Sequence, residues 1–522
     1  MTERYTGTVL VAGQALRRDR LLISVWTLLL GLVVYASAAA TSTLYDSAAD
    51  RVRAAEAIND NPAVVALYGP ILRVDSLGEL AMTKVTVLYA VGLALLILVV
   101  VRRHTRVDEE SGHAELLAGT ALGRDALLAG AVLEGAVVAV GVAILVAGAD
   151  IAGGLPVVGS IGFGATWLGT GLVAVGLTAV ACQLAASSRT CFAVSGAVLA
   201  GLYLMRAVGD IKAAWLSWLT PLGWNTRFSA WSEPRWWLLL LYLASALTLV
   251  VAAQTLRSRR DLGSGLFPAR PGPAHGSPRL RDALGLAWRV QQPALLGWSV
   301  GVVAMGLVMG AIAPGVGDLL DTDSGRELVE SMGGTGRLEE SLLAAVLSIA
   351  AVAITSFGIA CVTRASADER DGRSEQVLAT VTSRSRLLLA AYAAALGGVA
   401  WLLALTGLAT GLGYGGDVDG LVEAGLVQAP AVWVVIGVAA LLYAIASRWA
   451  LVSWAVLGIF LVLGQVGALL GLPAWVTGLS PFEHVSRLPV ESFRPAPSLT
   501  LTVIAAGLLL AAWWRYRRRD IG

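Results

Sequence analysis

The sequence predicts an all-α integral membrane protein with twelve transmembrane helices, arranged as two parallel six-helix repeats with both termini in the cytoplasm. Three observations lead to this fold class. Of the 522 residues, 57% are hydrophobic and only 14% are charged, whereas soluble domains carry roughly 25% charged residues. Apolar runs of membrane-spanning length recur along the chain. A polar segment also occurs twice, at an offset of 260 residues.

The apolar runs fall into two sets of six. A bilayer core about 30 Å thick needs about 20 apolar residues per helix. Such runs lie near 21–41, 82–101, 127–149, 160–185, 191–209 and 236–255, and then near 294–314, 342–362, 387–412, 430–446, 450–471 and 499–514. The first run ends in a sequence like a signal-peptide cleavage site, but it is longer than the apolar region of typical signal peptides. We therefore expect a retained helix.

The basic residues set the orientation, because cytoplasmic loops carry an excess of Lys and Arg. Arginines precede the first span, follow the second and eighth spans, and crowd the linker and the final tail, whereas the first and seventh loops are acidic. The linker 256–290 is rich in Pro, Gly and Arg, a composition typical of an exposed connector. It separates a first repeat, 1–255, from a second, 291–522. The even number of spans in each repeat gives both repeats the same orientation.

The repeated polar segment follows the second span of each half. "DEESGHAELLAGTALGR" (108–124) and "DERDGRSEQVLATVTSR" (368–384) share Asp, Glu, Gly, Glu, Thr and Arg in register. In each copy a glycine can break the chain between an acidic turn and a short helix with polar and apolar faces. A solvated connector would explain the arginines, but it would not explain why the other residues recur in register.

A second repeat lies between the fifth and sixth spans of each half. "LTPLGWNTR" ends at Arg227 and "LSPFEHVSR" ends at Arg487, and the prolines Pro221 and Pro481 coincide. Six tryptophans surround the first copy, which favours an aromatic belt at the headgroup level. The alternative is a pair of short re-entrant helices that cap a pathway, with each proline breaking the chain.

The sequence lacks the motifs of several kinds of site. It has no G-x-x-x-x-G-K-[ST] phosphate loop, no G-x-S-x-G elbow and no zinc-type histidine cluster, so we expect no enzyme activity, no cofactor and no metal site on this chain. The formal net charge of +2 and the lack of a basic groove argue against nucleic-acid binding. The three cysteines are expected to be small core residues. Energy must therefore come from an ATPase on another chain or from an ion gradient.

The clearest ionisable candidates inside predicted spans are Glu134 in the third and Arg206 in the fifth. Charged groups in a membrane commonly mark transport pathways, so both are pathway candidates. Glu134 is only about two turns from the cytoplasmic end, which favours a structural role over a proton relay. A pathway lined largely by apolar side chains would suit a lipophilic substrate.

The chain resembles the permease subunits of ABC-2 type transporters. The closest likeness is to the fused, two-repeat permeases of actinobacterial drug and polyketide-antibiotic exporters. The resemblance covers the whole chain and is carried by "RRHTRVDEESGHAELL" after the second span and by Ser/Thr-Pro after the fifth. It implies a permease in the bacterial cell membrane that moves a lipophilic small molecule outward between its halves. A separate ATP-binding subunit, expected in two copies, would supply ATP and Mg²⁺.

In such transporters the loop after the second span of each half docks on the ATPase. Carried onto this sequence, the resemblance implies contacts from Asp108, Glu109, Gly112 and Glu115, and from Asp368, Glu369, Gly372 and Glu375. Arg124 and Arg384 would lie at the return into the next span. The segments 5–20 and 279–292 would lie along the inner membrane surface. The second copy replaces Glu110, Ser111 and His113 by Arg370, Asp371 and Arg373, so the two docking surfaces are expected to differ.

Two other classes remain. A secondary transporter of the major facilitator type would also have twelve spans, and "DERDGR" faintly resembles its basic loop motif, but the first copy lacks those arginines. A membrane scaffold or lipid-modifying enzyme is the third class. The external loops contain no clustered catalytic group that favours the enzyme.

Overall fold

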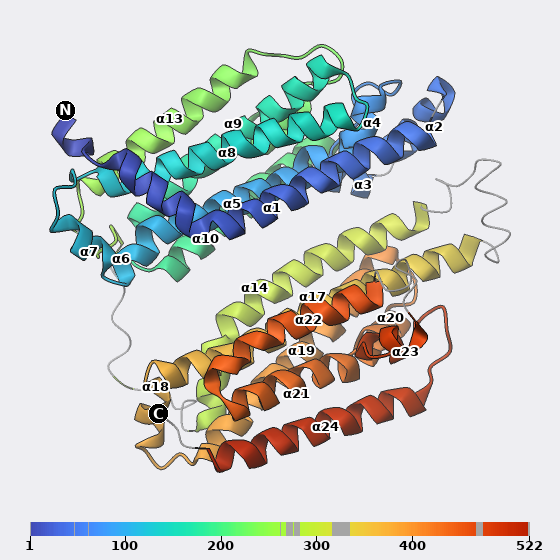
Figure 1. The fold of residues 1–522 in the computed structure, drawn as a ribbon. Coiled ribbons are helices and arrows are strands. Elements are labelled where there is room, and N and C mark those ends of the chain that lie inside the picture. Colours follow the sequence, from blue (N-terminus) through green and yellow to red (C-terminus); the bar gives the residue numbers. More distant parts are fainter. Residues whose placement is uncertain are drawn as a thin grey trace. The chain divides into compact units, whose positions relative to one another are not determined.

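The computed structural model describes residues 2–45, 47–60, 62–261, 263–267, 275, 282–315, 335–465 and 473–519. All regular structure in these residues is helical. The chain divides into two compact units, Met1–Gly272 and Pro273–Gly522 (Figure 1). The boundary falls inside the predicted linker 256–290.

The first unit begins with a short helix, η1 (Thr2–Tyr5). Its long helices are α1 (Thr8–Leu44), α5 (Ala90–Arg102), α8 (Ala126–Ala152), α9 (Val157–Leu184), α10 (Ser188–Ile211) and α13 (Leu238–Arg257). Its shorter helices are α2 (Ala48–Asn59), α3 (Pro62–Tyr68), α4 (Leu77–Lys84), α6 (Asp108–Glu110), α7 (His113–Ala118), α11 (Ala214–Trp218) and α12 (Pro221–Arg227). Two π-helical turns, η2 (Val85–Tyr89) and η3 (Arg103–Val107), join α4, α5 and α6 into one continuous helix.

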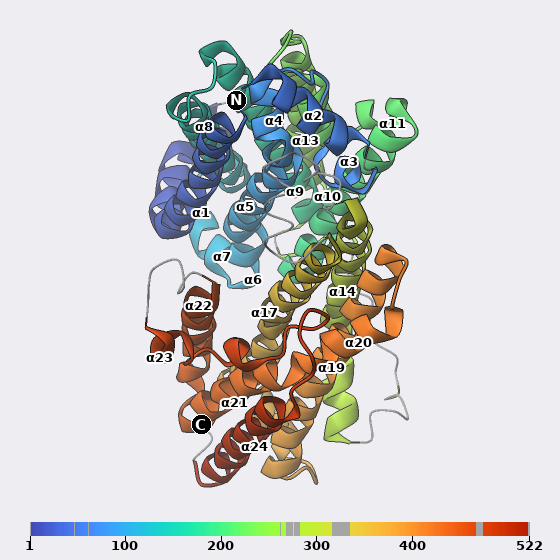
Figure 2. The same cartoon turned by 90° about the vertical axis from the view of Figure 1, so that its right-hand side faces the viewer.

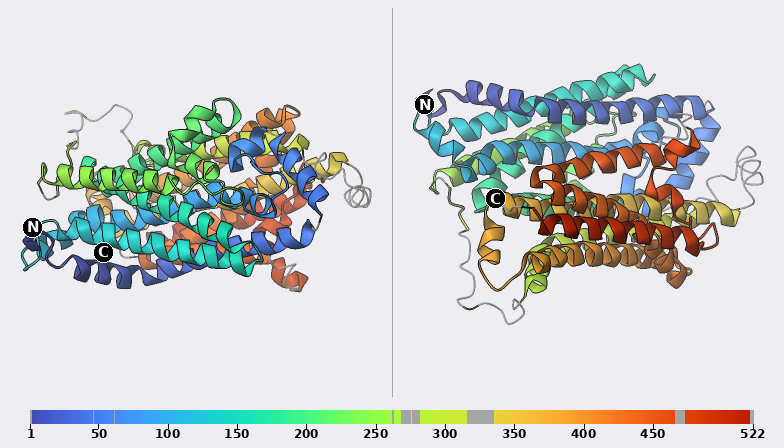
Figure 3. Two further views of the ribbon diagram at one scale, coloured as in Figure 1. Left: turned by 90° about the horizontal axis from the view of Figure 1, so that it is seen from above. Right: turned by 60° about the horizontal axis from the view of Figure 1, so that its bottom comes forward.

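The second unit repeats this plan. Its long helices are α14 (Ala283–Ile312), α17 (Thr335–Arg370), α19 (Arg384–Tyr414), α21 (Ala429–Ile445) and α24 (Pro495–Arg517). Its shorter elements are η4 (Ala313–Gly315), α18 (Arg373–Leu378), α20 (Val418–Val427), η5 (Ser447–Leu451), α22 (Val452–Gln465), α23 (Ala474–Thr477) and η6 (Pro481–His484). Within each unit the long helices run roughly side by side (Figure 3).

Eleven helices in the described residues are long and apolar enough to cross a membrane, and they coincide with eleven of the twelve predicted spans. The twelfth, predicted at 450–471, begins in the shorter apolar helix Ser447–Leu461 and continues into residues 466–472, which lie outside the described residues. The membrane-spanning, all-helical character is confirmed. The count of twelve and the positions of the termini stay predictions.

Burial along the spans follows the sequence repeat. In each unit the second, third and fourth spans are the most buried, and the first and last spans are mostly exposed. The fourth span, α9 in the first unit and α20–α21 in the second, is the most buried of all. Exposed leucines and valines on α1 are what a lipid-facing helix presents. The two halves therefore resemble each other in which spans are buried and which are exposed, as well as in sequence.

Close helix packing in the first unit depends on small residues. A Cβ at Gly169 of α9 would lie 2.4 Å from the Tyr242 ring of α13, so these helices approach closely only because the glycine has no side chain. Trp167, two residues earlier, is fully buried in the same core. Small residues at helix contacts are the usual means by which membrane helices pack.

The repeated polar segments lie at one end of each unit. In the first unit the N-terminus, α6 and α7 share an end, and in the second unit the C-terminus and α18 do (Figure 1). Backbone hydrogen bonds from Gly123 to Thr6 and from Asp125 to Arg4 fasten the N-terminus beside the loop before α8. The opposite end of the first unit carries α2, α3, α4 and α11 (Figure 2).

Two segments flank the predicted spans. Near the beginning of the linker Arg260 is buried, and the backbone amides of Leu266 and Phe267 donate to the carbonyls of Gln183 and Leu184, while the Phe267 side chain is exposed. The segments before each half's first span are also continuous with it. Residues 8–20 belong to α1 and residues 283–292 belong to α14.

Candidate functional site

The two copies of the repeated polar segment fold alike. Gly112 and Gly372 adopt left-handed conformations with φ of 78° and 72°, and each begins a six-residue helix, α7 or α18. The predicted glycine break is thereby confirmed in both halves. The burial pattern also matches, since Ala114 and Ser374 point inward while Glu115 and Glu375 are exposed.

We expect Gly112→Ala and Gly372→Ala to lower the free energy of unfolding by about 1–2 kcal/mol each, the usual cost of a left-handed alanine. A Cβ at either position meets no atom within 4 Å, so the cost comes from the backbone alone. Gly196→Ala in α10 is the matched control, because its Cβ also meets nothing and its backbone is helical. Thermal unfolding of the purified chain measures the difference. Equal unfolding temperatures for Gly112→Ala and Gly196→Ala would contradict the assignment.

Glu109 faces the interior of the first unit. Its carboxylate accepts hydrogen bonds from Arg106, at 2.9 Å, and from both terminal nitrogens of Arg260, which follows the last span of this half. Arg106 also donates to the Cys182 carbonyl at 2.6 Å, and the Arg260 Nε donates to Gln183 Oε1 at 2.8 Å. Glu109 thus connects the start of the repeated polar segment to the ends of the fourth and sixth spans.

Glu369 makes the corresponding tie in the second unit. Its carboxylate accepts hydrogen bonds from Arg519, behind the last span, and from the Tyr443 hydroxyl at 2.8 Å. Arg519 also donates to the Tyr443 carbonyl at 2.8 Å. Tyr443 stands 260 residues after Gln183. In both halves the glutamate of the polar segment, the end of the fourth span and the arginine after the last span are therefore connected. Both carboxylates therefore face arginines of their own chain, whereas Glu115 and Glu375 are exposed.

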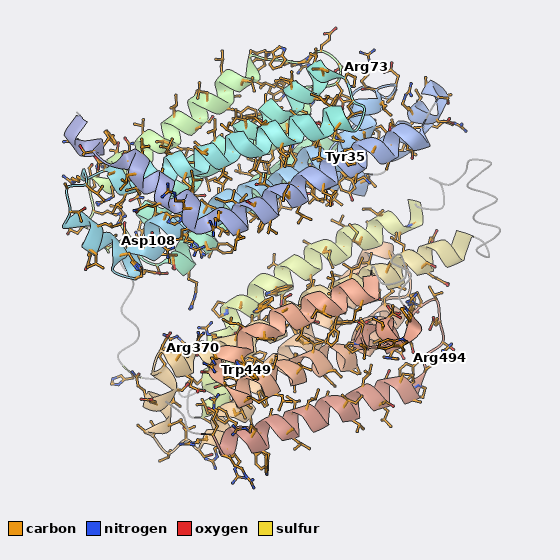
Figure 4. The ribbon with its side chains drawn as sticks, in the orientation of Figure 1. Tyr35, Arg73, Asp108, Arg370, Trp449 and Arg494 are labelled. Atoms are coloured by element: carbon orange, nitrogen blue, oxygen red, sulfur yellow. The ribbon has the colours of Figure 1, made fainter. Side chains whose placement is uncertain are left out.

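The first residue of each segment has different partners in the two halves. Asp108 forms an ion pair with Arg18 of α1 at 3.0 Å and lies 3.3 Å from His104 Nδ1. Asp368 accepts a hydrogen bond at 2.7 Å from Arg373, the residue that replaces His113, and this bond raises the pKa of Arg373. Asp108 therefore contacts the first long helix of its unit, α1, whereas Asp368 contacts a residue of its own polar segment. Figure 4 labels Asp108 and Arg370 at these ends of the two units.

The arginines that close the segments stand where they are predicted. Arg124 is exposed two residues before α8, and Arg384 is the exposed first residue of α19. Arg384 donates to the Arg519 carbonyl at 3.1 Å. Both positions mark the return into the third span of a half.

The outer motif of the first half forms a short buried helix. Pro221 begins α12, whose preceding Thr220 accepts a hydrogen bond from the amide of Gly223. Asn225 accepts a hydrogen bond at 2.9 Å from Thr170, halfway along α9, and donates to the Thr86 carbonyl at 3.1 Å. A helix that reaches mid-span residues in this way fits the re-entrant alternative. The exposed Trp215, Trp236 and Trp237 fit the aromatic belt, so the features of both alternatives occur together.

The outer motif of the second half is less buried. Pro481 is buried in η6, but Glu483 and His484 are exposed. Arg487 pairs with Glu483 at 3.5 Å on the surface, whereas its counterpart Arg227 is largely buried, 3.9 Å from Asp210. The repeat is therefore preserved in sequence but packed differently.

Arg206 organises the outer loop of the first unit. Its fully buried guanidinium donates to the carbonyls of Ala66 and Leu67 at the end of α3, at 2.6 and 3.3 Å, and pairs with Asp210 at 3.1 Å. It also lies over the Tyr203 ring, 4.7 Å from the centroid. Its two terminal nitrogens therefore hold α3 against α10, and a place for Arg206 in a pathway stays a prediction.

Glu134 lies in a buried polar cluster at the docking end of the first unit. It is fully buried, and its Oε1 lies 3.6 Å from Nε2 of His104. The same nitrogen lies 3.1 Å from Asp19 Oδ2, and the other oxygen of Asp19 pairs with Arg103 at 2.6 Å. Neither carboxylate oxygen of Glu134 accepts a hydrogen bond from the described residues, and its role, structural or in a pathway, stays a prediction.

Comparison with known proteins identifies the family of the chain. Residues 280–517 match the family model described as the C-terminal domain of the multidrug efflux system permease Rv1217c. The chain is also 38% identical over 528 residues to the multidrug efflux system permease protein Rv1217c of Mycobacterium tuberculosis, covering 99% of this chain and 96% of that protein. The chain belongs to the Rv1217c family of multidrug efflux permeases. The resemblance to drug-exporter permeases, stated from the sequence, is confirmed.

Several residues of the permease's docking end have no distinctive signal in the sequence. Arg260 and Arg519 look like two of many cytoplasmic arginines, yet both are buried against the repeated glutamates. One signal was available in the sequence. Arg260 and Arg519 each follow the last span of a half, and they are 259 residues apart, close to the repeat offset of 260. Asp19 and His104 had none, because their cluster is assembled from three segments far apart in the chain.

Proposed function

We propose that this permease is the membrane-spanning subunit of an ATP-driven exporter of the ABC-2 type. A separate ATP-binding subunit, in two copies, docks on α7 and α18, and its own ATP and Mg²⁺ provide the energy. The permease spans the bacterial cell membrane with twelve helices and both termini in the cytoplasm. It moves lipophilic small molecules outward along a pathway between its two halves.

The pair of matching short helices carries the proposal. α7 and α18 present Glu115 and Glu375 outward from the same register, each after a left-handed glycine. Behind each helix, Glu109 or Glu369 holds the arginine that follows the last span of its half. Force applied to α7 or α18 would thus reach the ends of several spans through charged hydrogen bonds, which are among the stronger contacts in proteins.

The two docking helices are not expected to act equally. The first segment is linked to α1 through Asp108 and Arg18, at 3.0 Å. The second closes on itself through Arg373, which pairs with both Asp368 and Asp371. Binding at α7 would therefore shift the start of the bundle more directly than binding at α18.

The substrate class rests on the relative, whose name describes multidrug efflux. For this permease we extend that description to lipophilic drugs or polyketide-type antibiotics. The short helix α12 and its counterpart η6, with Pro221 and Pro481 at their starts, would close the outer end of the pathway as re-entrant caps.

Transport in inside-out membrane vesicles tests the energy source. With the permease and its ATPase present, a lipophilic fluorescent dye is expected to accumulate on adding ATP, and a protonophore is expected to leave that accumulation unchanged. Vesicles with the permease alone are the control and should not accumulate the dye. Loss of accumulation under the protonophore, with ATP maintained, would favour the secondary-transporter alternative and contradict the proposal.

A further inference from the structure

Three buried side chains from separate helices meet at the docking end of the first unit. Asp19 comes from α1, His104 from the π-turn η3 and Glu134 from α8, and all three are at least 93% buried. One ligand-type atom of each lies within 4.8 Å of the others. His104 Nε2 is central, 3.1 Å from Asp19 Oδ2 and 3.6 Å from Glu134 Oε1. We call these residues the Asp19 cluster.

Glu134 is the residue that this arrangement leaves unsatisfied. Both of its carboxylate oxygens are buried, and neither accepts a hydrogen bond from the described residues. A buried carboxylate without a partner is costly, because its charge has lost the solvation of water. The neighbouring Arg103 does not supply the missing charge, since its guanidinium pairs with Asp19 Oδ1 at 2.6 Å. The carboxylate of Glu134 thus lies beside the central histidine nitrogen and has no donor of its own.

The spacing of the cluster is that of a metal coordination shell. Imidazole and carboxylate ligands bind Zn²⁺ at about 2.0–2.2 Å, which places neighbouring ligand atoms roughly 3–3.5 Å apart. The two distances from His104 Nε2, 3.1 and 3.6 Å, lie close to that range. One imidazole with two carboxylates favours a first-row divalent cation such as Zn²⁺ over a hard cation such as Ca²⁺.

The surroundings of the histidine are also those of a metal ligand. His104 Nδ1 lies 3.3 Å from Asp108 Oδ2, which leaves Nε2 free to bind the cation. A carboxylate on the second nitrogen of a metal-binding histidine commonly fixes its tautomer and orientation. A small pocket lined by His104, Asp108 and Leu117 lies beside α7, on the Nδ1 side of this histidine.

We propose that Asp19, His104 and Glu134 bind a single divalent transition-metal cation, with Zn²⁺ as the best-matched ion. The cation would join α1, the end of the second span and α8 directly behind the first docking helix. At offsets of 272 and 260 residues the second half has Gln291, Arg364 and Ala394, so each chain would hold one site. This inference does not rest on the proposed ATP-driven transport, and its test needs no transport.

Titration of the purified, chelator-treated full-length permease with Zn²⁺ alone tests the site. We expect one saturable Zn²⁺ per chain by calorimetry and elemental analysis. Glu134→Gln and His104→Asn should each weaken binding at least tenfold. His113→Asn is the matched control, because this exposed histidine nine residues further on lies outside the cluster, and it should bind as the wild type does. Absence of saturable binding, or equal affinity in Glu134→Gln, would overturn the proposal.

Two further measurements keep the test decisive if a variant folds poorly. Zn²⁺ should raise the unfolding temperature of the wild type and of His113→Asn but not of Glu134→Gln. In the wild type alone, added Co²⁺ should give visible absorption from a nitrogen and oxygen site, and Zn²⁺ should displace it. A Co²⁺ spectrum identical to that of the free ion in buffer would contradict the site without the use of any variant.

Discussion

The variant Glu115→Arg/Glu375→Arg is expected to lose co-purification with the ATPase and to lose ATP-driven efflux, while the permease itself still folds. Both glutamates are exposed, so the fold does not depend on them. Charge reversal at a docking surface places like charges together, which costs several kcal/mol and corresponds to at least a hundredfold weaker binding. Affinity purification of the complex and dye transport in vesicles measure the two losses.

Glu423→Arg is the matched control for this variant. Glu423 is also exposed, but it lies in α20, and its loop is predicted to face the outside. The same substitution there should leave ATPase binding unchanged. The single variants should differ from each other, because the two segments have different internal partners. Survival of both complex formation and ATP-dependent efflux in the double variant would show that the coupling assignment is wrong.

Glu109→Gln is expected to destabilise the permease by about 3–5 kcal/mol, the usual cost of removing one partner of a buried ion pair. Arg106 and Arg260, whose side chains are 0% and 2% exposed, would lose their common carboxylate. Glu369→Gln should have a smaller effect, because the Glu369 carboxylate holds one arginine, Arg519, whereas Glu109 holds two.

Thermal unfolding of the purified chains measures this pair of effects. Glu115→Gln is the control, since it removes an exposed carboxylate from the same segment and should leave the unfolding temperature unchanged. If Glu109→Gln unfolds at the temperature of Glu115→Gln, the buried tie contributes nothing and its role in transmitting force is lost with it.

The general plan of the fold could be predicted from composition and periodicity, because a membrane helix must be long, apolar and continuous. Side-chain contacts beside the spans could not be predicted in the same way. The composition after Arg257 is typical of a linker, and nothing in it indicates that Arg260 is buried against Gln183 and Glu109. The segment 8–20 reads as a surface helix but simply extends α1.

The sequence repeat in the two polar segments does not separate the roles of their residues. Glu109 and Glu115 are equally repeated, and their sequence spacing alone does not tell that one faces inward and the other outward. The left-handed glycine between them resets the helix direction, and only the three-dimensional structure shows the result. The sequence could not predict the Asp19 cluster either. Its three residues are far apart in the chain, and the sequence repeat gives no sign of the π-turn that carries His104, because the corresponding helix α17 has none.

Site-specific cross-linking from the docking helices is the most direct test of the central claim. A photoreactive residue is introduced at position 115, 375 or 423 of the full-length permease in membranes that contain the ATPase. The account predicts a permease–ATPase adduct from positions 115 and 375 and none from position 423. No adduct from either docking helix, or equal adduct from position 423, would contradict it.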